Sequence, residues 1–324
     1  MTDIEISTKK KLVVAAGRSN PDLADEIAAE LGIELAEIEI EDFSSGEIYV
    51  RFGDNVRGAD VFIVQSHYEP LNKNVMEQLI MIDAAKRASA KRISAVIPFY
   101  GYSRQDRKAR GREPISARLL ADLLVAAGVD RVLSVDLHSG QIQGFFDKPF
   151  DHITALPLLA DHLAERFDGD LVVVSPDAGG VHLADKYAKR LHAPLAILHK
   201  RRRTDVRNTT ETLEVIGDVE GRRCVLVDDM VDTAGTFTGG AEALLERGAI
   251  ETYGCATHAI LSDPAIDRLK NSPIKELVFT NSVPLPAEKQ IDKITVLSIA
   301  PVVASTIRAV FQDESVSEIF QGEN

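Results

Sequence analysis

Short apolar blocks alternate with amphipathic segments along almost the whole chain. The blocks are rich in valine, isoleucine and leucine and show no strict alternation with polar residues, which predicts strands buried on both faces of a parallel sheet. In the first half, the predicted strands are residues 11–17, 59–66, 92–98 and 131–138. In the second half, they are residues 171–177, 193–199, 222–229, 251–260, 275–281 and 293–299.

The segments between these blocks have the period of helices. In the first of them, Leu23, Ile27 and Leu31 lie on one face, with Pro21 in the first turn and Gly32 just beyond the end. Asn20 stands where a capping residue is expected. Residues 73–90 and 114–127 have the same character, and Gly128 closes the latter.

This order of strands and helices predicts an α/β protein with two similar, doubly wound, mainly parallel sheets. The pattern is interrupted at residues 147–157, which places the expected boundary between a domain of residues 1–150 and one of residues 151–324. We expect the last helix, from about residue 301, to return and pack on the first domain.

Composition excludes several classes of function. No charge-poor apolar stretch approaches the roughly 18 residues that a membrane span needs, and the acidic N-terminus has no signal-peptide pattern. Cys224 and Cys255 lie apart in apolar segments, as buried thiols of a cytoplasmic protein do. The net charge of −13 argues against a nucleic-acid partner. Two basic runs, 104–112 and 200–203, could be solvated faces, but on an acidic chain they favour sites for small polyanions.

Three predicted strands end in polar clusters: SVDLHSGQ, VVVSPDAGG and LVDDMVDTAGT. One such cluster is more often a helix cap than a site, but ligands of open parallel sheets bind beyond the carboxyl ends of the strands. Three clusters at that edge therefore indicate a ligand site. A lone histidine is usually structural, but His138, two residues after Asp136 at a strand end, is a candidate metal ligand.

The stretch 228–236 has the chemistry of a sugar-phosphate site. Gly235 permits close approach of a ligand to the backbone, Thr233 and Thr236 supply hydroxyls, and the N–H groups of the next helix suit a phosphate. Asp228 and Asp229 could hold ribose hydroxyls. Neither GxxxxGK[ST] nor GxGxxG occurs, so ordinary nucleotide-loop kinases and dinucleotide enzymes are poor candidates.

LVDDMVDTAGT resembles the phosphoribosyl-diphosphate-binding loop shared by phosphoribosyltransferases and ribose-phosphate diphosphokinases. Residues 99–116, 136–151 and 175–180 resemble signature segments of the diphosphokinases, and the similarity extends from about residue 10 to SVSEIF near the end. It implies two domains of phosphoribosyltransferase type. It also implies Mg²⁺-dependent transfer of the diphosphoryl group of ATP to the 1-hydroxyl of ribose 5-phosphate, releasing AMP.

The resemblance implies roles for individual residues. ATP contacts are expected at Phe43, Ser45, Gly46, Glu47, Arg104 and Gln105, although the family often has an acidic residue or asparagine where Ser45 stands. Ribose 5-phosphate contacts are expected at Arg202, Asp228, Asp229, Asp232, Thr233, Ala234, Gly235 and Thr236. The expected Mg²⁺ ligands are His138 and Asp177, and the expected catalytic pair is Lys200 and Arg202.

Two alternatives stand beside this hypothesis. A phosphoribosyltransferase would need a segment that recognises a base and would not need the arginine-rich run 104–112. A non-catalytic regulatory relative would be expected to have lost residues such as Lys200 or Asp177, which are present. The resemblance also implies a homo-hexamer, with inorganic phosphate and ADP as effectors.

Overall fold

The computed structural model describes residues 10–167, 169–201 and 212–319. They form two compact units: the described parts of Met1–Ile153 and Ala300–Asn324 make up unit 1, and Thr154–Ile299 makes up unit 2. The last long helix, α8 (Ala300–Gln312), therefore belongs to unit 1. None of the described helices is long and apolar enough to cross a membrane.

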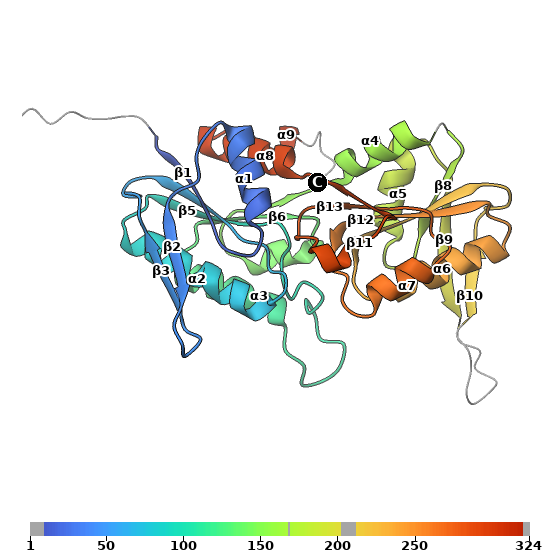
Figure 1. The fold of residues 1–324 in the computed structure, drawn as a ribbon, viewed down its shortest axis with the longest axis horizontal. Helices are drawn as coiled ribbons and strands as arrows, with labels where there is room; N and C mark the ends of the chain where they lie inside the picture. The colour runs from blue at the N-terminus through green and yellow to red at the C-terminus, as the bar shows by residue number, and fades with distance from the viewer. Residues whose placement is uncertain (1–9, 168, 202–211, 320–324) are drawn as a thin grey trace, which may run out of the picture. The chain divides into compact units, whose positions relative to one another are not determined.

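Unit 1 is built on a parallel sheet in the order β1-β4-β5-β6-β7. Its strands are β1 (Leu12–Ala16), β4 (Asp60–Val64), β5 (Arg92–Ile97), β6 (Arg131–Val135) and β7 (Phe150–Ile153). Its other elements are α1 (Pro21–Leu31), α2 (Leu71–Arg87), α3 (Ser116–Ala127), the 3₁₀ turn η1 (Gly140–Phe145), α8 and α9 (Val316–Ile319). Figure 1 shows α1 and α8 on one face of the sheet and α2 and α3 on the other.

A separate two-stranded hairpin packs beside α2 in unit 1. Strands β2 (Ile38–Asp42) and β3 (Ile48–Phe52) pair antiparallel, and Ile38, Ile40, Val50 and Phe52 pack against the apolar core. The sequence analysis did not predict this hairpin. Its alternating pattern gives one half-buried face, which differs from the continuous apolar blocks of strands buried on both faces.

Unit 2 contains a larger sheet in the order β10-β9-β8-β11-β12-β13-β14, in which only β10 is antiparallel to its neighbour. The strands are β8 (Leu171–Ser175), β9 (Leu195–Arg201), β10 (Thr212–Ile216), β11 (Arg223–Val231), β12 (Glu251–Ala259), β13 (Leu277–Thr280) and β14 (Ile294–Leu297). The helical elements are α4 (Leu156–Arg166), α5 (Val181–Arg190), α6 (Gly235–Glu246), α7 (Ala265–Asn271) and η2 (Ala287–Lys289).

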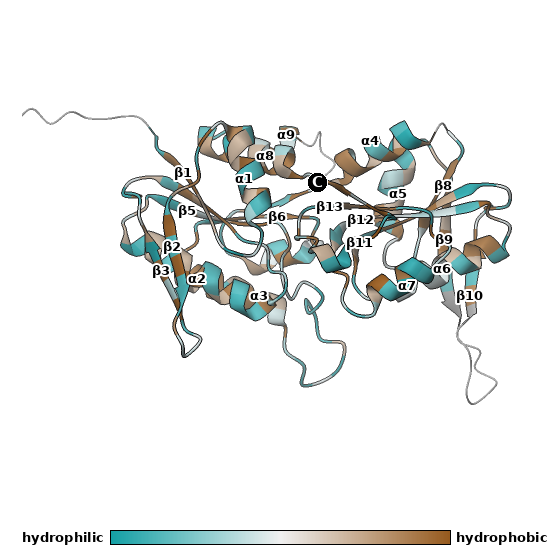
Figure 2. Cartoon of the chain, viewed as in Figure 1, coloured by the Kyte–Doolittle hydropathy of each residue, from teal (hydrophilic) through white to brown (hydrophobic). Residues whose placement is uncertain are grey.

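The burial of the strands explains why continuous apolar blocks in the sequence predicted most of them. Every residue of β4 and β8 is buried, and Figure 2 shows many strands in hydrophobic brown, whereas the helices carry both brown and teal. The predicted class, α/β with mainly parallel sheets, is confirmed.

Local predictions were wrong at four places. Residues 147–157, expected to interrupt the pattern, contain strand β7. Asn20 occupies the N-cap position of α1, but its side chain makes no capping hydrogen bond. The ends of the loop expected at 201–212 are strand, because Arg201 pairs with Thr212; the residues between them lie outside the described part. Strand β11 runs two residues beyond its predicted end, to Val231, so Asp228 and Asp229 lie within it rather than at its end.

Candidate functional site

Asp228 and Asp229 lie in the part of β11 that extends beyond the end of the neighbouring strand β8. The pairing of β11 with β8 stops at Leu226 and Val174, whereas its pairing with β12 continues to Val231. The polar end of β11 is therefore bordered on the β8 side by the turn that follows Ser175. This is the carboxyl edge of the parallel sheet, where the sequence analysis expected a ligand.

Like charges gather at this edge of unit 2. Asp228 Oδ1 accepts a hydrogen bond of 2.9 Å from the backbone N–H of Asp229. Burial raises the pKa of Asp228, and the charge of Asp229, with a smaller effect of Asp177, raises it further. Bringing carboxylates together without a counter-ion is unfavourable, so the edge suits a cation or the hydroxyl donors of a sugar.

The turn after β8 is organised around Asp177. Its Oδ1 atom accepts hydrogen bonds from the backbone N–H groups of Gly179 (2.8 Å) and Gly180 (3.0 Å), and its carbonyl accepts one from the Ser175 hydroxyl (2.7 Å). The carboxylate is thus fixed in orientation beside the end of β11. Among the described residues, no three His, Cys, Asp or Glu side chains are grouped closely enough to hold a metal ion by themselves. A Mg²⁺ here would need water and substrate oxygens, which is the shell this ion prefers.

The loop between β11 and α6 has the backbone geometry of an anion site. Ala234 adopts a left-handed conformation (φ 59°) immediately before Gly235, the first residue of α6. The first N–H groups of a helix have no partners within the helix, and they attract anions. Arg268 of α7 donates a hydrogen bond of 2.9 Å to the Thr233 carbonyl and so supports the loop. Sequence reasoning missed Arg268, because nothing in its local pattern points to the loop.

Of the predicted catalytic pair, the structure describes Lys200, which lies near the carboxyl end of β9, separated from β11 by β8 in the same parallel part of the sheet. Lys200 belongs to β9, where its backbone pairs with Leu213 of β10. Arg202 lies outside the described residues.

In unit 1, the predicted nucleotide residues 43–47 form the tip of the β2–β3 hairpin. Gly46 has a positive φ of 89°, and its N–H donates to the Phe43 carbonyl at 2.8 Å, closing a tight turn. The Ser45 hydroxyl donates to the Glu47 carboxylate at 2.8 Å. The Phe43 side chain is 56% exposed. An exposed phenyl ring on a defined turn is available to stack on a flat ligand.

Residues 99–116, which contain the other two predicted ATP contacts, Arg104 and Gln105, are tied to the segment after β6. Gln105 accepts hydrogen bonds from the Ser116 hydroxyl (2.7 Å) and, through its carbonyl, from the Ala117 N–H (3.2 Å). Asp106 accepts a hydrogen bond from Gln141 of η1. The structure therefore brings the segment that contains Arg104 next to the segment that contains His138.

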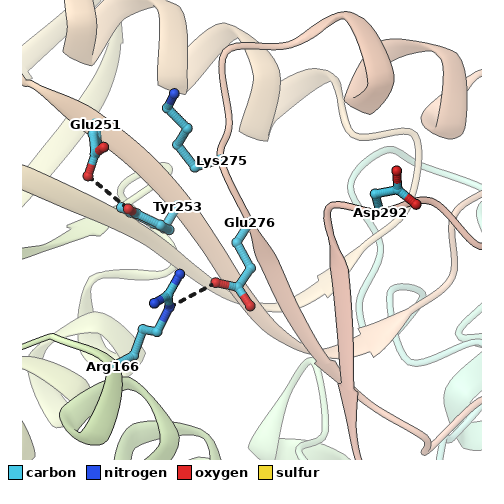
Figure 3. Close-up of a pocket in the computed structure, with 6 residues that line it drawn as sticks. All are labelled: Arg166, Glu251, Tyr253, Lys275, Glu276 and Asp292. Carbon is cyan, nitrogen blue, oxygen red and sulfur yellow. Dashed lines mark hydrogen bonds and ion pairs between the residues drawn. The ribbon is translucent and has the colours of Figure 1, made fainter.

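A polar hollow of about 440 Å³ lies at the opposite, amino edge of the unit 2 sheet (Figure 3). Its lining residues are Arg166, Glu251, Tyr253, Lys275, Glu276 and Asp292. Several of these groups pair with each other: Arg166 contacts Glu276 at 3.3 Å, and the Tyr253 hydroxyl donates to Glu251 at 2.8 Å, which lowers the pKa of Glu251. None of the predicted site residues lines this hollow.

Comparison with known proteins matches both parts of the chain. The family model described as the N-terminal domain of ribose phosphate pyrophosphokinase matches residues 12–128, and that of the phosphoribosyl synthetase-associated domain matches residues 206–321. A curated ribose-phosphate pyrophosphokinase of Streptomyces avermitilis is 57% identical over 321 residues, covering 99% of both chains. One of Bifidobacterium longum is 54% identical, covering 98% of this chain and 94% of its own.

A solved structure of a similar protein supports the same family. The phosphoribosylpyrophosphate synthetase from Mycobacterium smegmatis has a TM-score of 0.89 and 53% identity, covering 94% of this chain and 100% of its own. With relatives this similar over nearly the whole length, the chain belongs to the ribose-phosphate pyrophosphokinase family.

Proposed function

We propose that this chain transfers the β,γ-diphosphoryl group of ATP to the 1-hydroxyl of ribose 5-phosphate, giving 5-phosphoribosyl 1-diphosphate and AMP. The 1-hydroxyl oxygen attacks the β-phosphorus and loses its proton, and the bond from that phosphorus to the oxygen shared with the α-phosphate breaks. The names of the relatives support this reaction over a phosphoribosyltransferase or a non-catalytic relative.

The observation on which the proposal rests is the edge of unit 2 where β11 passes the end of β8. There Asp228 and Asp229 precede a loop whose backbone enters the N-terminus of α6. Carboxylates accept hydrogen bonds from the hydroxyls of a ribose, and helix N–H groups bind its 5-phosphate. We assign ribose 5-phosphate to these residues and to Asp232, Thr233, Ala234, Gly235 and Thr236.

ATP is assigned to unit 1. The exposed ring of Phe43 and the turn formed by Ser45, Gly46 and Glu47 suit an adenine base. Arg104 and Gln105 belong to a segment with five cations between residues 104 and 112, which suits the polyphosphate. We further propose that Lys200 and Arg202 stabilise charge on the transferring group, and that Arg202 also contacts ribose 5-phosphate.

A diphosphotransferase of this family works with a metal ion, and we propose that it is Mg²⁺. We propose Asp177, with its fixed carboxylate, and His138, with its imidazole, each as a Mg²⁺ ligand, with substrate oxygens completing the shell of the ion. When bound, the ion neutralises charge on the phosphates. We also propose a cytoplasmic homo-hexamer with inorganic phosphate and ADP as effectors, supported by the resemblance alone.

The test is to incubate the protein with ATP, ribose 5-phosphate and Mg²⁺ and to separate the nucleotides. AMP should form only when ribose 5-phosphate is present, with an equal amount of phosphoribosyl diphosphate. Formation of ADP instead, or of AMP without the sugar, would contradict the proposal.

A further inference from the structure

Four charged side chains join the turn end of the β2–β3 hairpin to the interior of unit 1. This group, called the Arg18 network below, consists of Arg18, Asp42, Lys73 and Glu77. Arg18 follows β1, Asp42 ends β2, and Lys73 and Glu77 belong to α2. Three separate elements therefore meet through these charges.

Glu77 is the buried end of the network. Its side chain has no exposed area, and both of its oxygens accept hydrogen bonds. Oε1 accepts from the backbone N–H of Arg18 (2.7 Å) and from Gln65 Nε2 (3.0 Å), and Oε2 accepts from Arg18 Nε (2.7 Å). A buried carboxylate is tolerated only with such compensation, so Arg18 is held firmly in one orientation.

The terminal nitrogens of the Arg18 guanidinium also reach the hairpin, and Nη2 lies 2.7 Å from Glu77 Oε2 as well. The two terminal nitrogens donate to the two carboxylate oxygens of Asp42, at 3.2 and 2.9 Å, and Lys73 Nζ lies 2.6 Å from Asp42 Oδ2. Hydrogen bonds from Arg18 and then Lys73 hold the pKa of Asp42 at about 2. Asp42 therefore stays ionised throughout the neutral range.

Asp42 lies on the inward face of β2, directly before the turn of the hairpin. Side chains alternate along a strand, and Asp42 takes the third inward position after Ile38 and Ile40. The apolar inner face of the hairpin thus ends in an ion pair, one residue before the exposed ring of Phe43. A two-stranded hairpin is only marginally stable by itself, so contacts beside its turn help to fix the orientation of its tip.

We propose that the Arg18 network orients the tip of the β2–β3 hairpin for ATP, and that Arg18 and Asp42 are positioning residues for the nucleotide. This inference rests on the proposed assignment of residues 43–47 to the adenine site. Because Glu77 already fixes the Arg18 side chain, Arg18 loses little further conformational entropy when it pairs with Asp42. The hairpin then loses less entropy when the nucleotide binds.

The decisive variant is Asp42→Asn, which keeps the shape of the side chain and removes its charge. ATP affinity should fall about 3- to 10-fold, the scale of one preorganised ion pair. The kcat and the KM for ribose 5-phosphate should change less than about twofold. Hydrogen exchange in a peptide covering residues 38–52 should become faster. Asp42→Glu, which keeps the carboxylate, should restore most of the ATP affinity.

Glu39→Gln is the matched control. Glu39 lies on the same strand and forms an exposed ion pair with Arg51 at 3.4 Å, so this variant removes the same charge without touching the Arg18 network. Glu39→Gln should leave both the ATP affinity and the hydrogen exchange of residues 38–52 unchanged. Equal effects of Glu39→Gln and Asp42→Asn would show that net charge alone is responsible and would overturn the proposal.

Two further results separate this inference from the proposed function. If Phe43→Ala leaves ATP affinity unchanged, the nucleotide assignment of the hairpin is wrong, and the positioning role is overturned with it. If Phe43→Ala weakens ATP binding while Asp42→Asn changes neither affinity nor exchange, the nucleotide site stands and the positioning role alone is wrong.

Discussion

The Nδ1 atom of the buried His67 accepts a hydrogen bond of 3.2 Å from the backbone N–H of Gly101. The other ring nitrogen, Nε2, lies 2.8 Å from Gln78 Oε1 and donates to it. Both ring nitrogens are thereby used by a neutral imidazole in one tautomer. A Cβ atom on Gly101 would lie 2.9 Å from His67 Cβ, so the two residues are also in close contact. His67 therefore fixes the start of the segment that contains Arg104.

This arrangement predicts a loss of stability in acid. Burial lowers the pKa of His67 to about 4. Because the unfolded chain takes up this proton near pH 6.5 and the folded chain does not, the stabilisation is complete above pH 6.5 and is lost progressively down to pH 4. The loss should be about 3 kcal/mol. Urea unfolding between pH 4.5 and 7.5 should show it in the wild type but not in His67→Asn, in which an amide oxygen replaces Nδ1. Equal pH slopes for the two proteins would contradict this role of His67.

The second prediction concerns the close carboxylates of β11. Since burial and Asp229 raise the pKa of Asp228, the ionised form of Asp228 weakens the fold at neutral pH. Asp228→Asn should therefore raise the melting temperature slightly. It should also weaken ribose 5-phosphate binding by roughly 1–3 kcal/mol, because a sugar hydroxyl would then donate to a neutral amide oxygen instead of a charged carboxylate. Calorimetry should find ATP affinity nearly unchanged; an equal loss for ATP would show that the loop is wrongly assigned.

For the metal site, the sharpest variant is Asp177→Asn. The amide oxygen can still accept the hydrogen bonds from Gly179 and Gly180, so the turn should remain while the charge is lost. The Mg²⁺ concentration for half-maximal activity should rise about tenfold or more, and His138→Ala should act in the same direction. Wild-type Mg²⁺ dependence in both variants would remove these residues from the site.

The fourth prediction distinguishes an effect of Gly235 on phosphate binding from an effect on the stability of the fold. A Cβ at Gly235 would come within 3.2 Å of Arg268 Nη1, the movable end of a long side chain. Gly235→Val should therefore lower the melting temperature by less than about 3 °C, equivalent to about 1 kcal/mol. The same side chain would occupy the phosphate space and should raise the KM for ribose 5-phosphate at least about tenfold. Gly239→Ala, where the added atom would lie 3.7 Å from Leu213, is the control and should change neither quantity.

The last prediction concerns the basic run that begins at Lys200. Groups that act mainly in the transition state affect turnover more than affinity. Lys200→Ala and Arg202→Ala should each reduce kcat by about 10²–10⁴-fold, the scale of one preorganised electrostatic group. Michaelis constants should move less than roughly tenfold, and Arg203→Ala should matter much less. Weaker ATP binding with normal kcat would show that the run only attracts the polyphosphate.

The sequence determined the class of fold and the family. Strands such as β4 and β8 are buried on both faces, so their composition alone identifies them, and the loop 228–236 has a local signature. Strands β2, β3, β7 and β10 escaped prediction because each mixes polar with apolar residues and is partly exposed, so none forms a continuous apolar block. Only the tertiary structure brought together residues distant in sequence: Arg268 with Thr233, His67 with Gly101, and Arg18 with Glu77 and Asp42. Hydrogen bonds and ion pairs between separate elements leave no periodicity in the chain, so no pattern along the sequence could have revealed them.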